Sequence, residues 1–199
     1  MKKIIFITLC VGACLWICKT YSWGAEVKGN NHNWTFIGSV NKNSVIRIHA
    51  SGKVDFGCSF GTCNDDAFAG VTGKSEEFMK LFNSFKSEIE VARRNVTDPI
   101  QLTSKTLGVI AKYFSNSHEP NYEQGGVWIK ILKRNNVPYI GTQLYYYWAV
   151  QGGINEYGLP INEDVNVYAK AHDGGKNPEA TKGYGDNKGS YNVTIETVH

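Results

Sequence analysis

Hydrophobic and polar positions alternate in the first third of the chain. Residues 34–40 and 45–50 place hydrophobic side chains at about every second position, and the polar residues 41–44 lie between them. An alternation with period two predicts β-strands, and a short segment of Asn, Lys and Ser predicts the turn that joins them. Residues 53–56 are predicted to form a third short strand, after a break at Ser51 and Gly52.

The spacing becomes helical from residue 75. Ser75 followed by Glu76 and Glu77 is typical of a helix start, because a capping side chain and acidic residues stabilise the first turn. Hydrophobic residues then recur three or four positions apart, at Phe78, Phe82, Phe85, Ile89 and Ala92. We expect this stripe to pack on the same domain; the alternative is a partner-binding face. A second helix is predicted near residues 104–114, with one face formed by Leu107, Ile110, Ala111 and Phe114.

Alternation returns in the last third of the chain. Predicted strands there cover residues 126–132, 144–150, 164–170 and 189–196. About eight short strands separated by loops predict a mainly β fold, an antiparallel β-sandwich of two small sheets. The helical region, about residues 74–124, is then a two-helix insertion in this single domain.

The N-terminus has the pattern of a secretory signal peptide. Two lysines follow Met1, and residues 4–18 are almost wholly apolar, a length below that of a membrane span. Ser22 and Gly24 are small residues at the −3 and −1 positions of a cut before Ala25. We therefore predict a signal peptide of residues 1–24 and a domain of residues 25–199, secreted or periplasmic.

Three alternatives at the N-terminus stay open. Cleavage after Ser22 also fits the small-residue rule, a lipoprotein cut before Cys14 fits it loosely, and an uncleaved leader would be a membrane anchor. No other segment is long and apolar enough to span a membrane.

Charge and cysteine content agree with a secreted protein. The chain has 21 Lys and Arg against 18 Asp and Glu, and three of the lysines lie in the leader, so the remainder is formally neutral. A nucleic-acid partner is not expected, because binding DNA or RNA needs clustered positive charge. Of the five cysteines, only Cys58 and Cys63 lie outside the leader, and two cysteines in an oxidising compartment usually pair. A Cys58–Cys63 disulfide would rigidify a loop and add about 2 kcal/mol by the chain-entropy estimate; a metal-binding pair is the weaker alternative.

No motif of an enzyme is visible in the sequence. The five histidines form no HExxH pattern, and neither a GxSxG elbow nor a phosphate-binding glycine loop occurs. Pairs of acidic residues could form a glycosidase dyad, but sequence cannot place them at the required separation. We therefore expect a binding protein and not an enzyme.

The segment 172–190 is rich in oxygen ligands and glycine. Its side chains include those of Asp173, Asn177, Glu179, Asp186 and Asn187. Calcium prefers six to eight oxygens from carboxylates, amides and main-chain carbonyls, which such a loop can supply. An ordinary hairpin loop is the alternative, because Asp, Asn and Gly are also the usual turn residues.

Four stretches together resemble the PA-I type galactophilic lectins, which are bacterial calcium-dependent sugar-binding proteins. In chain order they are residues 27–31, 45–57, 66–70 with 126–131, and 165–173 with 184–195. The resemblance implies a sandwich of two small sheets with one calcium ion at its end. It also implies that the calcium ion binds two neighbouring hydroxyls of a galactose.

The resemblance also implies a set of site residues. Asp173 would hold calcium and contact the sugar, the side chains of Asp186 and Asn187 would be adjacent ligands, and Phe56 and Gly183 would supply main-chain oxygens. Asp186 would also contact sugar, and the Tyr184 ring is a candidate for stacking on it; the alternative for Tyr184 is a place in the core.

Three departures from the family leave the site and its sugar open. The stretch between Asp173 and Gly185 is six residues longer than the loop of the family, which could displace Asp173 or let Asn177 or Glu179 take its part. Residues 58–63 replace a longer segment whose His-Pro-x-Gln run reaches the primary hydroxyl of the sugar, and the helical insertion is foreign to the family. We predict a calcium-dependent lectin or adhesin for galactosides or related glycans. Its sites would be held together in a homo-oligomer or a larger adhesin. The alternative is a secreted interaction or toxin-associated protein that has lost sugar binding and works through the helical insertion.

Overall fold

The computed structural model describes most of the strands and the first helix. The described residues are 4–6, 20–55, 66–68, 76–98, 126–139, 145–146, 158–172 and 183–198, with the single positions 101, 105, 108, 109 and 181. Among these residues no helix combines the length and the hydropathy needed to cross a membrane.

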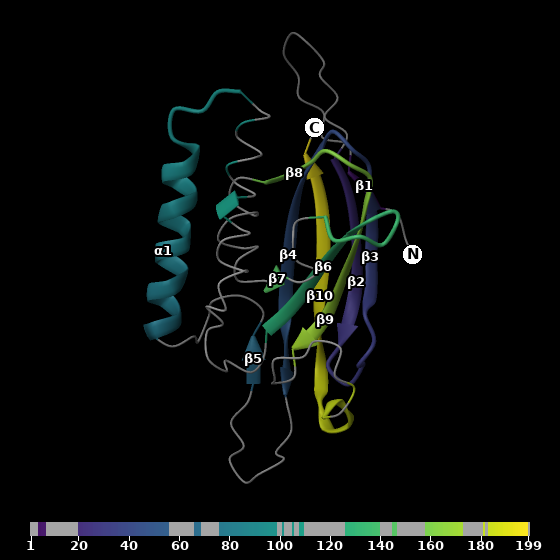
Figure 1. Cartoon of the computed structure of the whole chain (residues 1–199). Coiled ribbons are helices and arrows are strands. Elements are labelled where there is room, and N and C mark those ends of the chain that lie inside the picture. Colours follow the sequence, from purple (N-terminus) through teal and green to yellow (C-terminus); the bar gives the residue numbers. More distant parts are fainter. Residues whose placement is uncertain are drawn as a thin grey trace.

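Two antiparallel sheets form the body of the protein (Figure 1). The six-stranded sheet has the order β1 (Ile4–Phe6), β2 (Thr20–Lys28), β10 (Lys188–Val198), β4 (Ser44–Asp55) and β5 (Asp66–Phe68), and β8 (Leu159–Ile161) also pairs with β4. The four-stranded sheet has the order β3 (Thr35–Val40), β9 (Val165–His172), β6 (Gly126–Lys133) and β7 (Tyr145–Tyr146). The mainly β architecture of two antiparallel sheets that the sequence predicts is confirmed.

The core lies between the two sheets, and the alternation along each strand places it there. On β9 the side chains of Val165, Val167 and Ala169 are fully buried. On β10 the same is true of Tyr191, Val193 and Ile195, while Asn192 is exposed and Thr194 is partly exposed. Burial of one Val or Ile contributes about 1.5–3 kcal/mol, so these paired inner faces account for much of the driving force for folding.

One side of the sandwich is closed where β2 meets β3. Trp23 of β2 packs against the hydrophobic core. A side chain at Gly38 of β3 would place its Cβ only 3.1 Å from the Cβ and Cγ of Trp23. The register of β3 also shifts between Phe36 and Gly38. Glycine at position 38 therefore lets the indole lie directly over the β3 backbone.

Strand β4 corrects the predicted break at Ser51 and Gly52. The two short strands predicted on either side of these residues are one continuous strand, Ser44–Asp55. Gly52 has a φ of 99°, and a Cβ there would lie 2.5 Å from the Ser190 main-chain oxygen. Glycine thus allows a close approach to β10 inside the strand instead of ending it.

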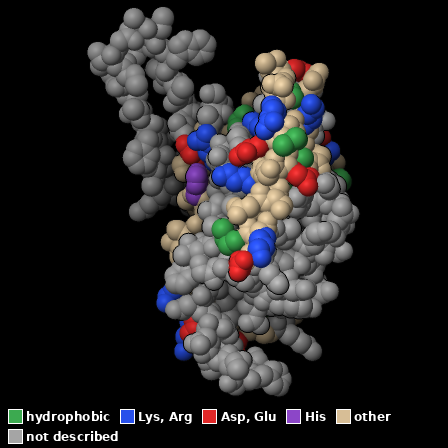
Figure 2. Space-filling view, turned by 90° about the vertical axis from the view of Figure 1, so that its left-hand side faces the viewer, with side chains coloured by type: hydrophobic (Ala, Val, Ile, Leu, Met, Phe, Trp, Pro, Cys, Tyr) green, Lys and Arg blue, Asp and Glu red, His purple; other side chains and the backbone are tan. Residues whose placement is uncertain are grey.

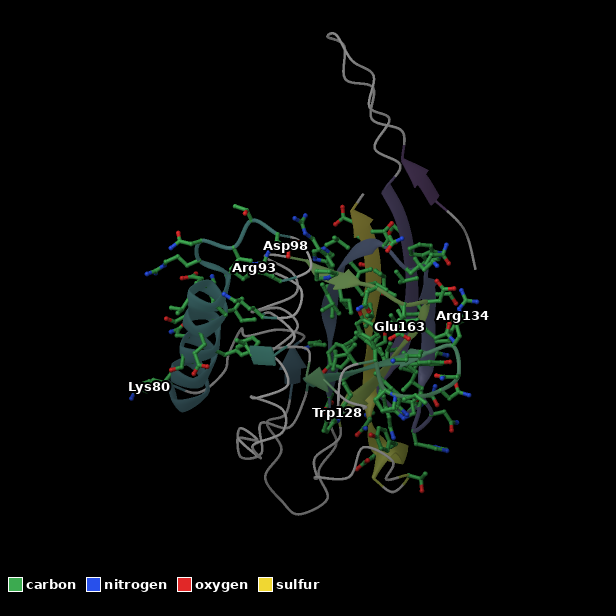
Figure 3. All side chains as sticks on the ribbon, turned by 45° about the horizontal axis from the view of Figure 1, so that its top comes forward. Lys80, Arg93, Asp98, Trp128, Arg134 and Glu163 are labelled. Atoms are coloured by element: carbon green, nitrogen blue, oxygen red, sulfur yellow. The ribbon has the colours of Figure 1, made fainter. Side chains whose placement is uncertain are left out.

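Helix α1 (Glu76–Arg93) confirms the first predicted helix. Phe85 and Ile89 are fully buried on one face. Lys80 pairs with Glu76 at 2.9 Å on the exposed face, and Figure 3 shows Lys80 directed away from the sandwich. Figure 2, viewed from the side of α1, shows positive and negative side chains interspersed on the described surface.

The second predicted helix, at residues 104–114, lies mostly outside the described residues. Within the part that the structure describes, α1 is the one α-helix with defined bounds. Upstream, the main-chain N–H of Gln101 donates to a carboxylate oxygen of Asp98 at 3.4 Å, the arrangement of an N-cap. The single positions 101, 105, 108 and 109 are helical.

Candidate functional site

Strands β4 and β9, each followed in the sequence by a predicted ligand, both end near the turn that precedes β10 (Figure 1). The last rung between β4 and β10 pairs Asp55 with Lys188, so the segment after β4 begins next to the turn that precedes β10. That turn is a short 3-10 helix, η2 (Tyr184–Asp186). The phenol of Tyr184 donates to the main-chain oxygen of Ala171 at 3.0 Å, which ties the turn to the end of β9.

A glycine makes the entry to the η2 turn. Gly183 precedes η2 in the left-handed region, with φ 99° and ψ −20°, which a residue with a side chain rarely adopts. The main-chain N–H of Asn187 closes the turn by donating to the oxygen of Tyr184 at 3.4 Å. The turn thus gathers the Gly183 carbonyl, the Asp186 carboxylate and the Asn187 amide within five consecutive residues.

Asn187 is the most constrained of the predicted ligands. It is only 5% exposed, and its Nδ2 donates to the main-chain oxygen of Gly29 at 3.0 Å. Gly29 in turn donates its N–H to the oxygen of Gly189 at 3.0 Å. The bond through Nδ2 fixes the rotation of the amide group and with it the direction of Oδ1, which is the atom of this side chain able to bind a cation.

Close packing of the main chain supports this arrangement. A Cβ at Gly29 would lie 2.5 Å from a methyl carbon of Val54, and one at Gly189 would lie 2.6 Å from the main-chain oxygen of Lys53. Glycine at both positions lets residues 28–31, β4 and the start of β10 come together beneath the turn. Sequence reasoning included the stretch 27–31 in the resemblance but gave Gly29 no role.

Asp186 differs from Asn187 in its surroundings. Its side chain is exposed to solvent at the end of η2. An exposed carboxylate keeps its hydration until a cation arrives, so it can add negative charge to a site without the cost of a buried, unpaired charge. A Cβ at the neighbouring Gly185 would meet nothing within 4 Å, so the space outside the turn is open there.

Tyr184 has a packing role at this end of the sandwich. It is 5% exposed, and the ammonium of Lys170 lies 4.7 Å from the centre of its ring. Its hydroxyl is bonded to Ala171, so both ends of the side chain have protein neighbours. The contact with sugar that the sequence offered for Tyr184 has no exposed ring face to support it, and the core alternative describes its surroundings.

A lysine and tryptophan cluster next to Tyr184 was not found from the sequence. Lys170 is 1% exposed, and its ammonium also lies 6.0 Å from the centre of a ring of Trp34. Lys130 lies over the same indole at 4.0 Å. The signal was present as Lys130 on β6 and Lys170 on β9, because each lies between buried core residues of its strand and so on the outer face of the four-stranded sheet.

Four predicted residues lie outside the described part of the chain. They are Phe56, Asp173 and the two cysteines of the predicted disulfide, Cys58 and Cys63. Within the described ranges no group of three His, Cys, Asp or Glu side chains is placed to hold a metal ion. The predicted calcium set contains two carboxylates, and the described residues include only that of Asp186.

Comparisons with known proteins give a likeness to solved structures. No family model matches the chain, and no curated protein matches it. Among solved structures, the chain is similar to one described as the N-terminal domain of EclA, a PllA-like lectin. The two are 14% identical with a TM-score of 0.35, and the match covers 88% of this chain and 95% of that chain. A likeness of this degree says nothing of the ligand of the present protein.

Proposed function

We propose that this protein binds carbohydrate without catalysis, through a calcium ion held at the η2 end of the sandwich. The observation that supports the proposal is the buried Asn187 amide, fixed by Gly29 next to the exposed Asp186 carboxylate. An ordinary hairpin turn does not need an amide anchored to a main-chain oxygen 158 residues away. A metal site needs such an anchor, because groups around the site must orient its ligands before the ion binds.

The residues of the turn fit a calcium ion by the chemistry of their donors. Gly183 offers a main-chain carbonyl, Asp186 a carboxylate and Asn187 an amide oxygen, and hard oxygen donors of these three kinds are what calcium prefers. Phe56 and Asp173 follow directly after β4 and β9, whose ends lie at this turn, and they complete the proposed set. The bound ion would accept two neighbouring sugar hydroxyls as ligands.

Each residue of the turn has a separate task in this proposal. Asn187 orients one oxygen toward the ion, and Asp186 contributes the negative charge that attracts it. Tyr184 holds the turn against β9 through its bond to Ala171. We place Tyr184 in the support of the site and not in contact with sugar.

The test is calorimetric titration of the purified protein with calcium, followed by galactose in the presence of calcium and of a chelator. We expect one calcium ion per chain, and sugar binding that the chelator abolishes. Asp186→Ala should weaken calcium binding. Glu76→Ala, an exposed carboxylate on α1, is the matched control and should leave it unchanged.

The outcomes separate the two functions considered from the sequence. Calcium binding without galactose binding would be consistent with a lectin of another specificity, which a screen of other glycans would identify. Failure to bind calcium would overturn the proposal and turn attention to the helical insertion. The described exposed face of α1 carries mixed charges (Figure 2). Among the side chains of this helix that the structure describes, Val91, at 60%, is the large hydrophobic one that is well exposed. No described observation therefore favours the insertion as a binding surface.

Secretion and multivalency belong to the same proposal. A single exposed sugar site is weak, so useful adhesion needs several sites that bind together. We propose that the protein is exported and acts as a homo-oligomer or as the binding part of a larger adhesin.

A further inference from the structure

Strand β2 runs through the predicted end of the leader. It covers Thr20–Lys28, and its residues from Tyr21 to Lys28 pair in continuous register with β10. A cut after Gly24 would divide this strand in the middle. It would remove four of the eight residues of β2 that pair with β10, including Trp23 opposite Ile195.

Trp23 belongs to the sandwich. Along β2 the side chains of Trp23, Ala25 and Val27 alternate with exposed or half-exposed neighbours and lie against the hydrophobic core. Gly38 on β3 leaves room for the indole, because a Cβ there would lie 3.1 Å from Trp23. A mature chain that began at Ala25 would leave this side of the core uncovered.

Gly24 has a structural reason to be small. A Cβ at this position would lie 2.8 Å from the Cγ2 of Thr194 on β10. Glycine at position 24 therefore serves the pairing of two strands, and its small size is not evidence for a protease site. If Gly24 is set aside, Ser22 at the −3 position is the one small residue left to support a cut before Ala25.

The contacts of β1 point to the bond before Trp23. Strand β1 pairs with Thr20, Tyr21 and Ser22, in the register Phe6 to Thr20 and Ile4 to Ser22. A cut between Ser22 and Trp23 removes β1 together with the three residues that it pairs with. Six residues of β2 then remain paired with β10, from Trp23 to Lys28.

We propose that the leader is removed by hydrolysis of the Ser22–Trp23 peptide bond by a signal peptidase. Water adds across the bond, so that Ser22 gains a carboxyl group and Trp23 a free amino group. Thr20 and Ser22 are the small residues that such an enzyme requires at the −3 and −1 positions.

The experiment expresses the full chain in a secreting bacterial host and determines the N-terminus of the exported protein by Edman sequencing and intact mass. We expect the sequence Trp-Gly-Ala-Glu. A protein that begins at Ala25, one that begins at a lipid-modified Cys14, or one that retains Met1 would each overturn the proposal.

One variant tests the bond independently. Thr20→Tyr places a bulky residue at −3 of the Ser22–Trp23 bond and leaves both small residues of the Gly24–Ala25 bond in place. Precursor should accumulate in Thr20→Tyr, while Lys19→Gln, one position further out, should be processed normally. Normal processing of Thr20→Tyr would contradict the proposal. Because residue 20 is removed by the cut, any mature protein is identical and misfolding cannot explain the result.

Discussion

The side-chain amide of Asn187 donates a hydrogen bond of 3.0 Å to the main-chain oxygen of Gly29, at a sequence distance of 158 residues. This bond joins the turn before the last strand to the end of the first long strand. It is buried, so both groups depend on it. The contact therefore gives the candidate site a rigid side even before a ligand binds.

Replacement of this amide should destabilise the protein in the absence of calcium. Asn187→Asp keeps an oxygen for the ion but turns a donor into an acceptor that faces the oxygen of Gly29. We expect a loss of about 1–3 kcal/mol in the free energy of unfolding, measured by urea denaturation in chelator. Stability equal to that of the wild type would show that the bond does not hold the turn.

Asp186→Ala should leave the stability without calcium nearly unchanged and reduce the stabilisation that calcium provides. Its side chain is exposed, so in chelator we expect a change within about 0.5 kcal/mol. With calcium at about 100 times its dissociation constant, the wild type should gain about 2.7 kcal/mol by mass action, and the variant should gain much less. Thermal denaturation with and without calcium measures both effects. An equal gain in stability from calcium in the two proteins would show that Asp186 does not bind the ion.

Tyr184→Phe separates support of the turn from contact with sugar. The variant keeps the ring but loses the bond of the phenol to Ala171. We expect a loss of about 1 kcal/mol of stability together with weaker calcium binding. Sugar affinity at saturating calcium should stay the same. A selective loss of sugar affinity would instead place the phenol in the sugar site.

The indole of Trp23 should contribute to stability as a core residue does. Trp23→Ala removes a partly buried side chain that packs over Gly38, so we expect a loss of about 2–3 kcal/mol. The control is Val91→Ala, which is 60% exposed on α1 and should cost less than about 0.5 kcal/mol. Chemical denaturation of the mature protein gives both values. Similar losses in the two variants would mean that Trp23 is not part of the core.

The stability of the fold should fall in strongly alkaline solution. Burial raises the pKa of the Tyr191 phenol above its usual value of about 10, because the phenolate would lose its hydration in the core. The folded state therefore holds this proton more tightly than the unfolded state does. Its contribution is fully present below pH 10 and is lost as the pH rises above that value.

Tyr191→Phe isolates this effect. Burial also raises the pKa of Tyr139, so the variant should show a shallower fall in unfolding free energy above pH 10, not a flat one. Denaturant titrations at several pH values between neutral and strongly alkaline measure the slope. An unchanged slope in Tyr191→Phe would show that this phenol is not responsible.

Strand positions were predictable where one face of the strand is buried and the other is not. Residues 34–40, 126–132, 164–170 and 189–196 alternate because the inner side chains meet the opposite sheet, and each corresponds to a strand. Strand β2, Thr20–Lys28, was missed because the apolar leader precedes it and its small residues resemble a protease site. The break predicted at Gly52 was wrong because glycine there serves a close approach between strands.

The candidate site was predictable only as a set of residue types. Asp, Asn and Gly around residue 186 indicated oxygen ligands, but nothing in the local sequence shows that Asn187 is bonded to Gly29. That contact depends on the order of strands in the sheet, which brings β2 beside β10. The burial of Tyr184 likewise depends on Lys170 and Ala171 of another strand.

The position of β10 has a consequence for how the protein is made. The last strand of the sequence lies between β2 and β4. The six-stranded sheet therefore lacks a central strand until residues 188–198 are available. Until then, the edges of β2 and β4 that pair with β10 have no partner. Strand pairings over such long sequence distances also form slowly. The larger sheet is therefore complete only after residues 188–198 have been made. Under the proposed export, this late completion would leave the chain able to pass through a membrane channel before it folds.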